Sequence, residues 1–221
     1  MDKLSVRALL SLEYTISASL FQTVNYPFEV LPFISDYIKE LGQTLDMSVY
    51  EKKGDNIYIA RSATVAETAI IKEPCIICAG ATVGNFSILR EGVIIGRDCV
   101  VGNSVEIKNS ILFDLATVPA FNYVGDSILG YSSNLGAGAV TANVKSDKTL
   151  VTVKTEDSRM DTGLKKFGAI VGDCVEIGCL AVLNAGTVIG KNTNIYPLSN
   201  VRGVIPPNCI YKNAGELVEK L

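Results

Sequence analysis

The chain has 221 residues, of which 48% are hydrophobic, and its formal net charge is −3. It contains no run of lysine and arginine and no basic-aromatic pattern, so we expect no nucleic-acid partner. No apolar run approaches the length of a membrane span and Glu13 interrupts the N-terminal apolar stretch, so we expect neither a membrane segment nor a signal peptide, and a cytoplasmic location.

The first part of the chain, residues 1–50, is predicted to be helical. Leucine and isoleucine recur at roughly helical spacing over residues 4–21, which predicts an amphipathic helix. Pro27 and Pro32 predict an extended link, and a second helix is expected over residues 33–41, ending at Gly42. We expect this segment to cover an open end of the following domain or to pack on its side, while a role in binding a partner protein stays open.

The second part, residues 51–212, carries an aliphatic residue every six positions. The first run of this ladder is Ile59, Val65, Ile71, Ile77, Val83, Leu89, Ile95, Val101 and Ile107. A period of six fits neither an α-helix nor an ordinary strand, and it predicts a solenoid of short strands. The ladder slips by one residue before Leu112 and again before Leu129, and it ends at Pro206 and Pro207. Residues 213–221 are expected to form a C-terminal tail.

A polar, charged insertion interrupts the ladder at about residues 141–170. We expect a loop or a small excursion there. The distance from position 141 to position 171 is thirty residues, or five whole hexads, so the register of the ladder should continue beyond it.

The cysteines and the absence of histidine limit the possible metal chemistry. Six cysteines without an export signal are typical of free thiols in a reducing compartment. Cys75 and Cys78 form a C-x-x-C motif, but no second pair lies at zinc-ligand spacing, so we expect no metal site. The chain has no histidine, and therefore lacks the commonest metal ligand and the usual proton acceptor at neutral pH.

Three cations are predicted to stack on one face of the solenoid. If one coil takes eighteen residues, Lys72, Arg90 and Lys108 lie on one line at the usual strand spacing. Such a line is either a solvated face or a stripe that binds phosphate. The residue pattern leaves both interpretations open.

The six-residue ladder resembles that of the hexapeptide-repeat proteins. The resemblance implies a mainly β fold, a left-handed parallel β-helix with three hexads per coil, preceded here by the helical segment. It also implies a homotrimer with active sites between subunits, and acyl transfer from a CoA thioester. Another activity found on this fold, that of the γ-type carbonic anhydrases, needs three histidine ligands to zinc and is excluded by the composition.

A closer resemblance, over about residues 81–212, is to the acetyltransferase half of the bacterial and archaeal bifunctional enzymes that make UDP-N-acetylglucosamine. It is carried by residues 86–92 (FSILREG), 101–109 (VGNSVEIKN), 118–126 (VPAFNYVGD), 134–138 (NLGAG), 141–143 (TAN) and 166–173 (KFGAIVGD). An archaeal-type insertion, residues 161–168 (DTGLKKFG), adds to it. No glycine-rich phosphate loop follows a predicted strand near the N-terminus, so the resemblance does not extend to the nucleotidyltransferase half.

The resemblance implies a role for individual residues in binding an amino-sugar 1-phosphate and acetyl-CoA. It places Arg90, Lys108 and Lys166 on the sugar phosphate, and Tyr123 and Asn134 on the sugar. Asn143 would come from a neighbouring subunit and orient the reacting groups. Ala137, Cys179 and Lys212 would lie along CoA, although the family usually has serine and arginine at the last two positions.

One position departs from the family. Ala120 stands where the family has the histidine that takes the proton from the attacking amine. Alanine cannot accept a proton, and a positioned base typically contributes about 10²- to 10⁴-fold to the rate. Tyr123 or Asp126 could substitute only with a strongly shifted pKa or through a water molecule.

Three explanations for Ala120 remain open. It is a deliberate replacement in an ordinary acetyltransferase, it marks a natural relative that lost catalysis, or a different base moves the acyl group. We therefore expect an impaired N-acetyltransferase acting on a glucosamine 1-phosphate-like substrate. The alternative is an inactive trimeric relative that binds sugar phosphate or CoA as a sensor or scaffold.

Overall fold

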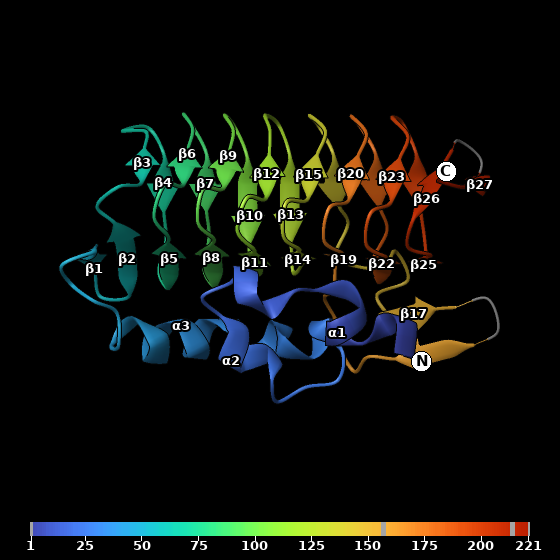
Figure 1. Ribbon diagram of the computed structural model, residues 1–221, viewed down its shortest axis with the longest axis horizontal. Coiled ribbons are helices and arrows are strands. Elements are labelled where there is room, and N and C mark those ends of the chain that lie inside the picture. The colour runs from blue at the N-terminus through green and yellow to red at the C-terminus, as the bar shows by residue number, and fades with distance from the viewer. Residues whose placement is uncertain (1, 156–157, 213–214, 221) are drawn as a thin grey trace.

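The computed structural model describes residues 2–155, 158–212 and 215–220, and most of these form a three-sided coil of short strands (Figure 1). The first sheet contains, in spatial order, β1 (Tyr50–Gly54), β2 (Ile57–Ala60), β5 (Cys75–Ile77), β8 (Val93–Ile95), β11 (Ser110–Leu112), β14 (Ile128–Leu129), β19 (Ala169–Val171), β22 (Thr187–Ile189) and β25 (Val204–Ile205).

The other two sides of the coil are built in the same way. The second sheet contains β3 (Thr64–Val65), β6 (Thr82–Val83), β9 (Val100–Val101), β12 (Thr117–Val118), β15 (Asn134–Leu135), β20 (Glu176–Ile177), β23 (Asn194–Ile195), β26 (Cys209–Tyr211) and β27 (Leu217–Glu219). The third sheet contains β4 (Ile70–Ile71), β7 (Ile88–Leu89), β10 (Glu106–Lys108), β13 (Tyr123–Gly125), β16 (Val140–Thr141), β21 (Val182–Leu183) and β24 (Asn200–Val201).

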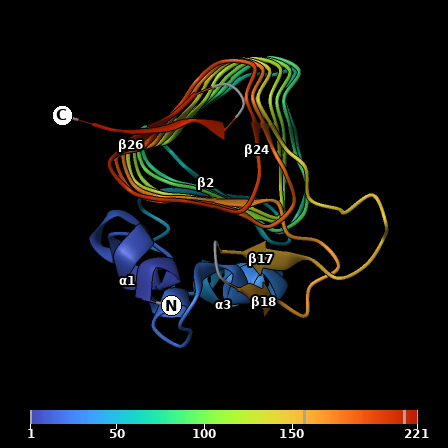
Figure 2. The same cartoon turned by 90° about the vertical axis from the view of Figure 1, so that its right-hand side faces the viewer.

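The coil is left-handed. Figure 2 looks along it from the C-terminal end, and the chain passes clockwise from the first sheet to the second and third while it advances toward the viewer. The predicted left-handed parallel β-helix with a small helical segment is thus confirmed. An antiparallel strand covers one sheet edge at each end of the coil, β1 on β2 in the first sheet and β27 on β26 in the second, and a covered edge is not open to pairing.

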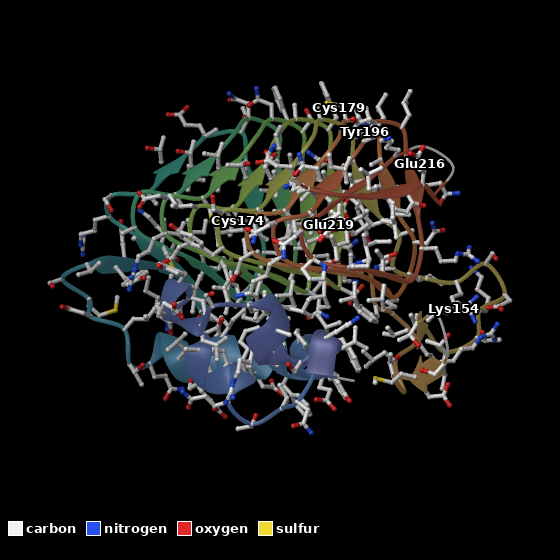
Figure 3. All side chains as sticks on the ribbon, turned by 45° about the vertical axis from the view of Figure 1, so that its right-hand side comes forward. Lys154, Cys174, Cys179, Tyr196, Glu216 and Glu219 are labelled. Carbon is white, nitrogen blue, oxygen red and sulfur yellow. The ribbon has the colours of Figure 1, made fainter. Side chains whose placement is uncertain are left out.

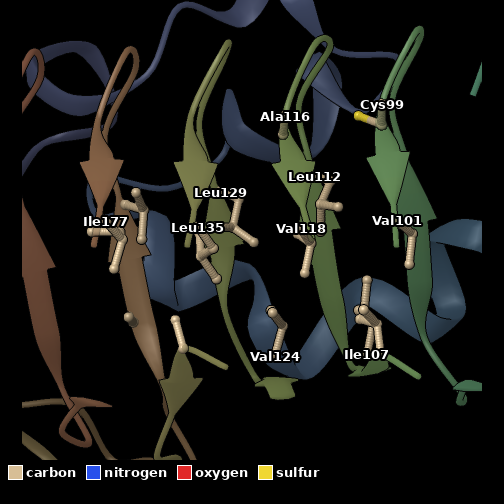
Figure 4. Close-up of a cluster of buried hydrophobic side chains, with 14 of the residues drawn as sticks. Cys99, Val101, Ile107, Leu112, Ala116, Val118, Val124, Leu129, Leu135 and Ile177 are labelled. Atoms are coloured by element: carbon tan, nitrogen blue, oxygen red, sulfur yellow. The ribbon is translucent and has the colours of Figure 1, made fainter. Parts of the chain in front are cut away.

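Strand pairing follows the ladder and its slips. Ile76 pairs with Ile94 and Ile94 with Ile111, so successive coils contain eighteen and then seventeen residues. The side chains of the ladder point into the coil and form its core, where Leu89, Ile107 and Val124 are fully buried. Figure 4 shows this core as rows of aliphatic side chains that lie above one another from coil to coil.

The N-terminal segment folds into short helices rather than one long helix. These are η1 (Asp2–Leu4), α1 (Val6–Leu9), η2 (Leu12–Tyr14), α2 (Ala18–Phe21), η3 (Pro27–Phe33) and α3 (Ile34–Gly42). The longest of the helices described, α3, has nine residues, and none of them has the length and apolar character needed to cross a bilayer.

The predicted continuous helix over residues 4–21 is wrong because its backbone has other partners. The carbonyl oxygens of Leu9 and Tyr14 accept hydrogen bonds from the amides of Asp173 and Asp114 in the coil, at 3.1 and 2.9 Å. The Thr15 hydroxyl accepts a bond from the Ser17 amide, a local arrangement that competes with a helix.

The extended link predicted at Pro27 and Pro32 is also wrong. Residues 27–33 form the 3₁₀ helix η3, with Pro27 at its first position, where a missing amide hydrogen costs no helical bond. The predicted second helix is confirmed as α3.

The helices pack on one side of the coil, which decides between the two positions that the sequence left open. The middle residues of the first-sheet strands point outward, and Ile94, Ile111 and Ile170 among them are fully buried. They share a second hydrophobic cluster with Phe21, Ile34 and other residues of the helices. Runs such as Cys75–Ile77, apolar at each position, are the sequence signal of a sheet buried on both faces.

The insertion forms a hairpin that extends the same cluster. Its strands β17 (Thr152–Lys154) and β18 (Arg159–Asp161) pair antiparallel. Val151 and Val153 are fully buried beside the helices. β14 then pairs with β19 as an ordinary rung, with Leu129 opposite Val171, so the expected continuation of the register is confirmed.

Candidate functional site

Two of the stacked cations are paired with carboxylates on the outer face of the third sheet. Arg90 Nη1 lies 3.0 Å from Glu106 Oε1, and its Nη2 lies 3.7 Å from Glu91 Oε1. Lys108 Nζ lies 3.3 Å from the same oxygen of Glu91. Lys72, the third cation of the line, has no ion pair with any described residue. A phosphate bound here would share or displace these carboxylates.

The pKa values of this group reflect the pairing. The hydrogen bond to Glu106 is the main cause that raises the pKa of Arg90. A backbone hydrogen bond is the main cause that lowers the pKa of Glu91, and Lys108 lowers it further. The side chains of Arg90 and Glu91 therefore stay charged at neutral pH. Together with Glu106 and Lys108 they form a compact set of alternating charges.

Beside these charges lies a hydrogen-bonded cluster built on Asp126. Asp126 is buried, and its Oδ1 accepts a bond from Asn109 Nδ2 at 2.9 Å. Its Oδ2 accepts a bond from the side-chain amide of Asn143, which also donates to the hydroxyl of Tyr123 at 3.3 Å. Burial is the main cause that raises the pKa of Tyr123, and Asp126 adds to it. The phenol is therefore a neutral hydrogen-bond donor at pH 7 and a poor base.

The end of the insertion reaches this cluster. The amide of Phe167 donates to the carbonyl oxygen of Asn143 at 2.9 Å, and the amide of Gly168 donates to that of Asp126 at 2.8 Å. Lys166, the next residue before them, is exposed. The structure thus brings Arg90, Lys108, Tyr123, Asn143 and Lys166 to one side of the coil.

A second set of predicted residues lies along the corner between the second and third sheets. Ala120, Ala137 and Cys179 occupy equivalent positions in successive coils, because the amides of Gly138 and Leu180 donate to the carbonyl oxygens of Ala120 and Ala137, at 3.1 and 2.9 Å. Figure 3 shows Cys179 and Tyr196 on this edge.

Lys212 follows β26 and begins the corresponding corner of the last coil. Its Nζ lies 2.9 Å from Glu216 Oε1. The hydrogen bond to Glu216 is also the main cause that raises the pKa of Lys212. The cation is therefore fully charged but already partnered, like those of the third sheet.

Asn134 lies apart from the other sugar-binding candidates. It sits on the outer face of the second sheet, where it accepts a bond from the hydroxyl of Thr117 and donates to Glu176 Oε2 at 2.8 Å. Tyr123 faces outward from the third sheet. Within one chain the two side chains therefore do not face a common site.

The residues on either side of Ala120 in the chain have no side chain that can accept a proton. Its chain neighbours are Pro119 and Phe121, and its own carbonyl oxygen is engaged by Gly138. The nearest carboxylates along the chain are those of Asp114 and Asp126, each six residues away; Arg97 engages the first, and the side-chain amides of two asparagines engage the second.

Sequence reasoning missed a row of exposed apolar side chains on the same corner. Phe86, Phe121, Leu180 and Leu198 are 68%, 71%, 58% and 70% exposed. Each follows a second-sheet ladder residue by three positions and has a left-handed backbone, with φ near 60°. A large apolar residue at this offset in four coils is a signal that the sequence could have given. We call these four residues the apolar ridge.

The cysteine motif is buried in the structure. Burial is the main cause that raises the pKa of Cys75, and it raises that of Cys78 to about 11. Both thiols therefore stay protonated at neutral pH, and the thiolate is the form that binds metal. In the part of the chain that the structure describes, no three histidine, cysteine or acidic side chains converge on a point that could hold a metal ion.

Comparison with known proteins places these features in context. A family profile described as the GMPPB C-terminal domain matches residues 71–165. The bifunctional sugar-1-phosphate nucleotidylyltransferase/acetyltransferase of Sulfurisphaera tokodaii is 36% identical over 94 residues, or 42% of this chain and 23% of that protein. The bifunctional protein GlmU of Methanococcus maripaludis is 40% identical over 92 residues, or 42% of this chain and 22% of that protein.

The matched stretch thus spans less than a quarter of the length of these relatives. The uncharacterised acetyltransferase YaiX of Escherichia coli matches over a longer stretch, at 27% identity over 164 residues, 74% of this chain and 71% of that protein. Among solved structures, a point mutant of AntD, an N-acyltransferase from Bacillus cereus in complex with dTDP and coenzyme A, aligns with a TM-score of 0.42. The identity is 17%, over 75% of this chain and 80% of that one.

The repeating ladder, the parallel coil and the sequence relatives agree with one another. The chain is a parallel β-solenoid with a six-residue repeat, and about two fifths of its length is similar to part of the bifunctional sugar-1-phosphate nucleotidylyltransferase/acetyltransferases.

Proposed function

We propose that the chain is an N-acetyltransferase that uses acetyl-CoA and an amino-sugar 1-phosphate such as glucosamine 1-phosphate, and that its turnover is slow because Ala120 replaces the base. The observation that carries this proposal is the grouping of Arg90, Lys108, Tyr123, Asn143 and Lys166 on one side of the coil. The relatives named as acetyltransferases support the reaction class.

The charged residues of the third sheet fit a sugar phosphate. Arg90 would offer its guanidinium fork and Lys108 a point charge, while Glu91 and Glu106 hold both cations in place until the anion arrives. The neutral phenol of Tyr123 would donate to a sugar hydroxyl, and Asn143, fixed by Asp126, would keep that phenol oriented. Lys166 would contribute a further positive charge at the rim.

Acetyl-CoA would lie along the corner that carries Ala120. The backbone at Ala137, the side chain of Cys179 and the cation of Lys212 follow this corner toward the C-terminal end of the coil. Ala120, Ala137 and Cys179 are small, so an extended pantetheine chain would pass over them beside the apolar ridge.

A homotrimer would bring the separated groups together. Asn134 and Tyr123 do not face a common site in one chain, so a complete site needs residues from a neighbouring subunit. The apolar ridge is the surface that such a neighbour would cover, because exposed apolar rows of this kind mark interfaces more often than solvent-facing surface.

The missing base limits the rate rather than the binding. In the reaction the amine nitrogen bonds to the thioester carbon, the carbon–sulfur bond breaks, and the sulfur leaves as the thiol of CoA once a proton is taken from nitrogen. With alanine at position 120, water or buffer must take that proton. The expected loss is about 10²- to 10⁴-fold relative to an enzyme with a positioned base.

The same observation favours the second candidate, an inactive trimeric relative that binds sugar phosphate or CoA as a sensor or scaffold. The two candidates share the binding residues and differ only in turnover. They are therefore separated by measuring binding and turnover on the same preparation.

The test is thiol release from acetyl-CoA in the presence of glucosamine 1-phosphate, with N-acetylglucosamine 1-phosphate, whose amine is blocked, as the control acceptor. We expect slow thiol release with glucosamine 1-phosphate and none with N-acetylglucosamine 1-phosphate. Calorimetric binding of both substrates without release would establish the binding relative. If the chain shows no binding and no thiol release with any amino-sugar phosphate, both candidates are overturned.

A further inference from the structure

A cleft of about 600 Å³ opens between the third sheet and the insertion. Ala142, Asn184 and Gly203 line the side of the cleft toward the coil, and residues 144–147, 149–150 and the strands β17 and β18 line the side toward the insertion. Figure 2 shows this insertion arching away from the coil before it returns beneath the first sheet. The volume lies within the range of about 300–1,000 Å³ typical of small-molecule sites.

The lining of the cleft is polar and predominantly basic. It contains the four cations Lys145, Lys154, Arg159 and Arg202 and the two carboxylates Asp147 and Asp161. Lys145 lies 3.3 Å from Asp147. The other three cations form no ion pair with any residue that the structure describes, so the described lining carries four positive and two negative charges.

Two of these cations are held side by side by the backbone. A Cβ added at Gly203 would lie 2.9 Å from the carbonyl oxygen of Lys154 and 3.8 Å from its Cβ, so only glycine allows the hairpin to lie this close to the coil. Lys154 therefore sits beside Arg202, the neighbour of Gly203, although the two are far apart in sequence. Figure 3 shows Lys154 on the hairpin at the C-terminal end of the solenoid.

Like charges placed together repel each other unless an anion lies between them. An anion bound between Lys154 and Arg202 would offset this repulsion. A guanidinium fork next to an ammonium suits phosphate oxygens, and two neighbouring cations with a third at the rim match the charge of a diphosphate better than that of a single phosphate.

We propose that this cleft binds the diphosphate group of a nucleotide-containing ligand, through Lys154 and Arg202, with Arg159 at the rim. Two sources share this chemistry: a nucleoside-diphosphate sugar, and CoA, whose diphosphate would then lie in this cleft and not along the corner of Ala120 proposed above. The lining residue Ala142 precedes Asn143, so the cleft adjoins the side of the coil that carries Tyr123 and Lys108. The proposal goes beyond acetyl transfer and does not depend on it, because a chain that binds without turnover has the same cleft.

The test is titration calorimetry of the full chain with inorganic pyrophosphate at low salt. Lys154→Gln combined with Arg202→Gln should weaken binding at least tenfold. A matched double variant, Lys39→Gln with Lys52→Gln, removes two exposed cations elsewhere and should stay within twofold of the unmodified chain. Circular dichroism and the melting temperature establish that each variant is folded.

CoA and UDP-glucose are then titrated into the same variants. If the Lys154/Arg202 variant binds only one of these two ligands more weakly than the unmodified chain does, that ligand is the source of the diphosphate. If it binds both more weakly, the cleft accepts both ligands. The proposal is overturned if the unmodified chain does not bind pyrophosphate, if both double variants lose affinity equally, or if neither nucleotide ligand is affected. None of these outcomes alters the thiol-release result.

Discussion

Single residues of the third sheet combine positive charge with restraint. Arg90 and Lys108 are held by Glu91 and Glu106, so a phosphate bound as proposed would gain two oriented cations but would compete with two carboxylates. The net affinity for an anion therefore depends on both signs of charge. Removing a cation and removing its carboxylate should act in opposite directions.

Arg90→Gln should weaken the binding of glucosamine 1-phosphate about tenfold, because a charge-assisted bond to phosphate is lost. Glu106→Gln should leave binding unchanged or strengthen it. Calorimetry measures both, with Lys39→Gln as the control cation on α3. Equal small effects of Arg90→Gln and Lys39→Gln would show that the stacked cations are only a solvated face.

The pH dependence of turnover should carry no inflection from the protein between pH 5 and 8, since the chain has no histidine. The pKa of Tyr123 is raised, so its phenol remains a donor below that pKa and is lost as a donor only as the pH rises through it. The rate should therefore increase with pH as the substrate amine deprotonates and not decline below about pH 10. A bell-shaped profile centred near pH 7 would mean that another group acts as the base.

At the scale of elements, the N-terminal helices and the inserted hairpin bury the outer face of the first sheet, whereas the second sheet leaves outward residues exposed. An outward-facing side chain on the first sheet should therefore contribute more to the free energy of unfolding than one on the second sheet. Ile94 is fully buried under the helices, and Val100, in the next strand of the same coil, is 43% exposed.

Ile94→Ala should lower the free energy of unfolding by about 2–5 kcal/mol, the usual cost of a large-to-small change in a core. Val100→Ala should cost less than about 0.5 kcal/mol in a single chain. Urea unfolding followed by circular dichroism compares the two. Similar small losses would mean that the helices contribute little to the stability of the coil.

The ladder was predictable because each of its positions repeats one environment, the interior of the coil, in successive rungs. The course of the N-terminal segment was not predictable. The carbonyl oxygens of Leu9 and Tyr14 accept hydrogen bonds from the amides of Asp173 and Asp114, which are distant in sequence. Similarly, the line of Arg90 and Lys108 followed from the coil length, while their pairing with Glu91 and Glu106 depends on side-chain directions that spacing does not define.

For the whole molecule, the expected assembly is a trimer. A homotrimer should have a mass of about 71 kDa, three times the 23.6 kDa of one chain. Phe121→Glu together with Leu198→Glu should shift it to the monomer, because two charges would then lie in an apolar contact. Light scattering after size-exclusion chromatography measures both masses. A monomeric unmodified chain, or a trimer indifferent to these changes, would show that the apolar ridge is not the interface.

The most direct test of the proposed chemistry is the rate of thiol release by Ala120→His with glucosamine 1-phosphate and acetyl-CoA. If Ala120 occupies the position of the base in a working site, histidine should raise kcat/KM at least tenfold and introduce an inflection near the ordinary histidine pKa of about 6.5. A folded variant that gains less than tenfold on every amino-sugar phosphate tested would show that the reacting amine is not bound beside residue 120.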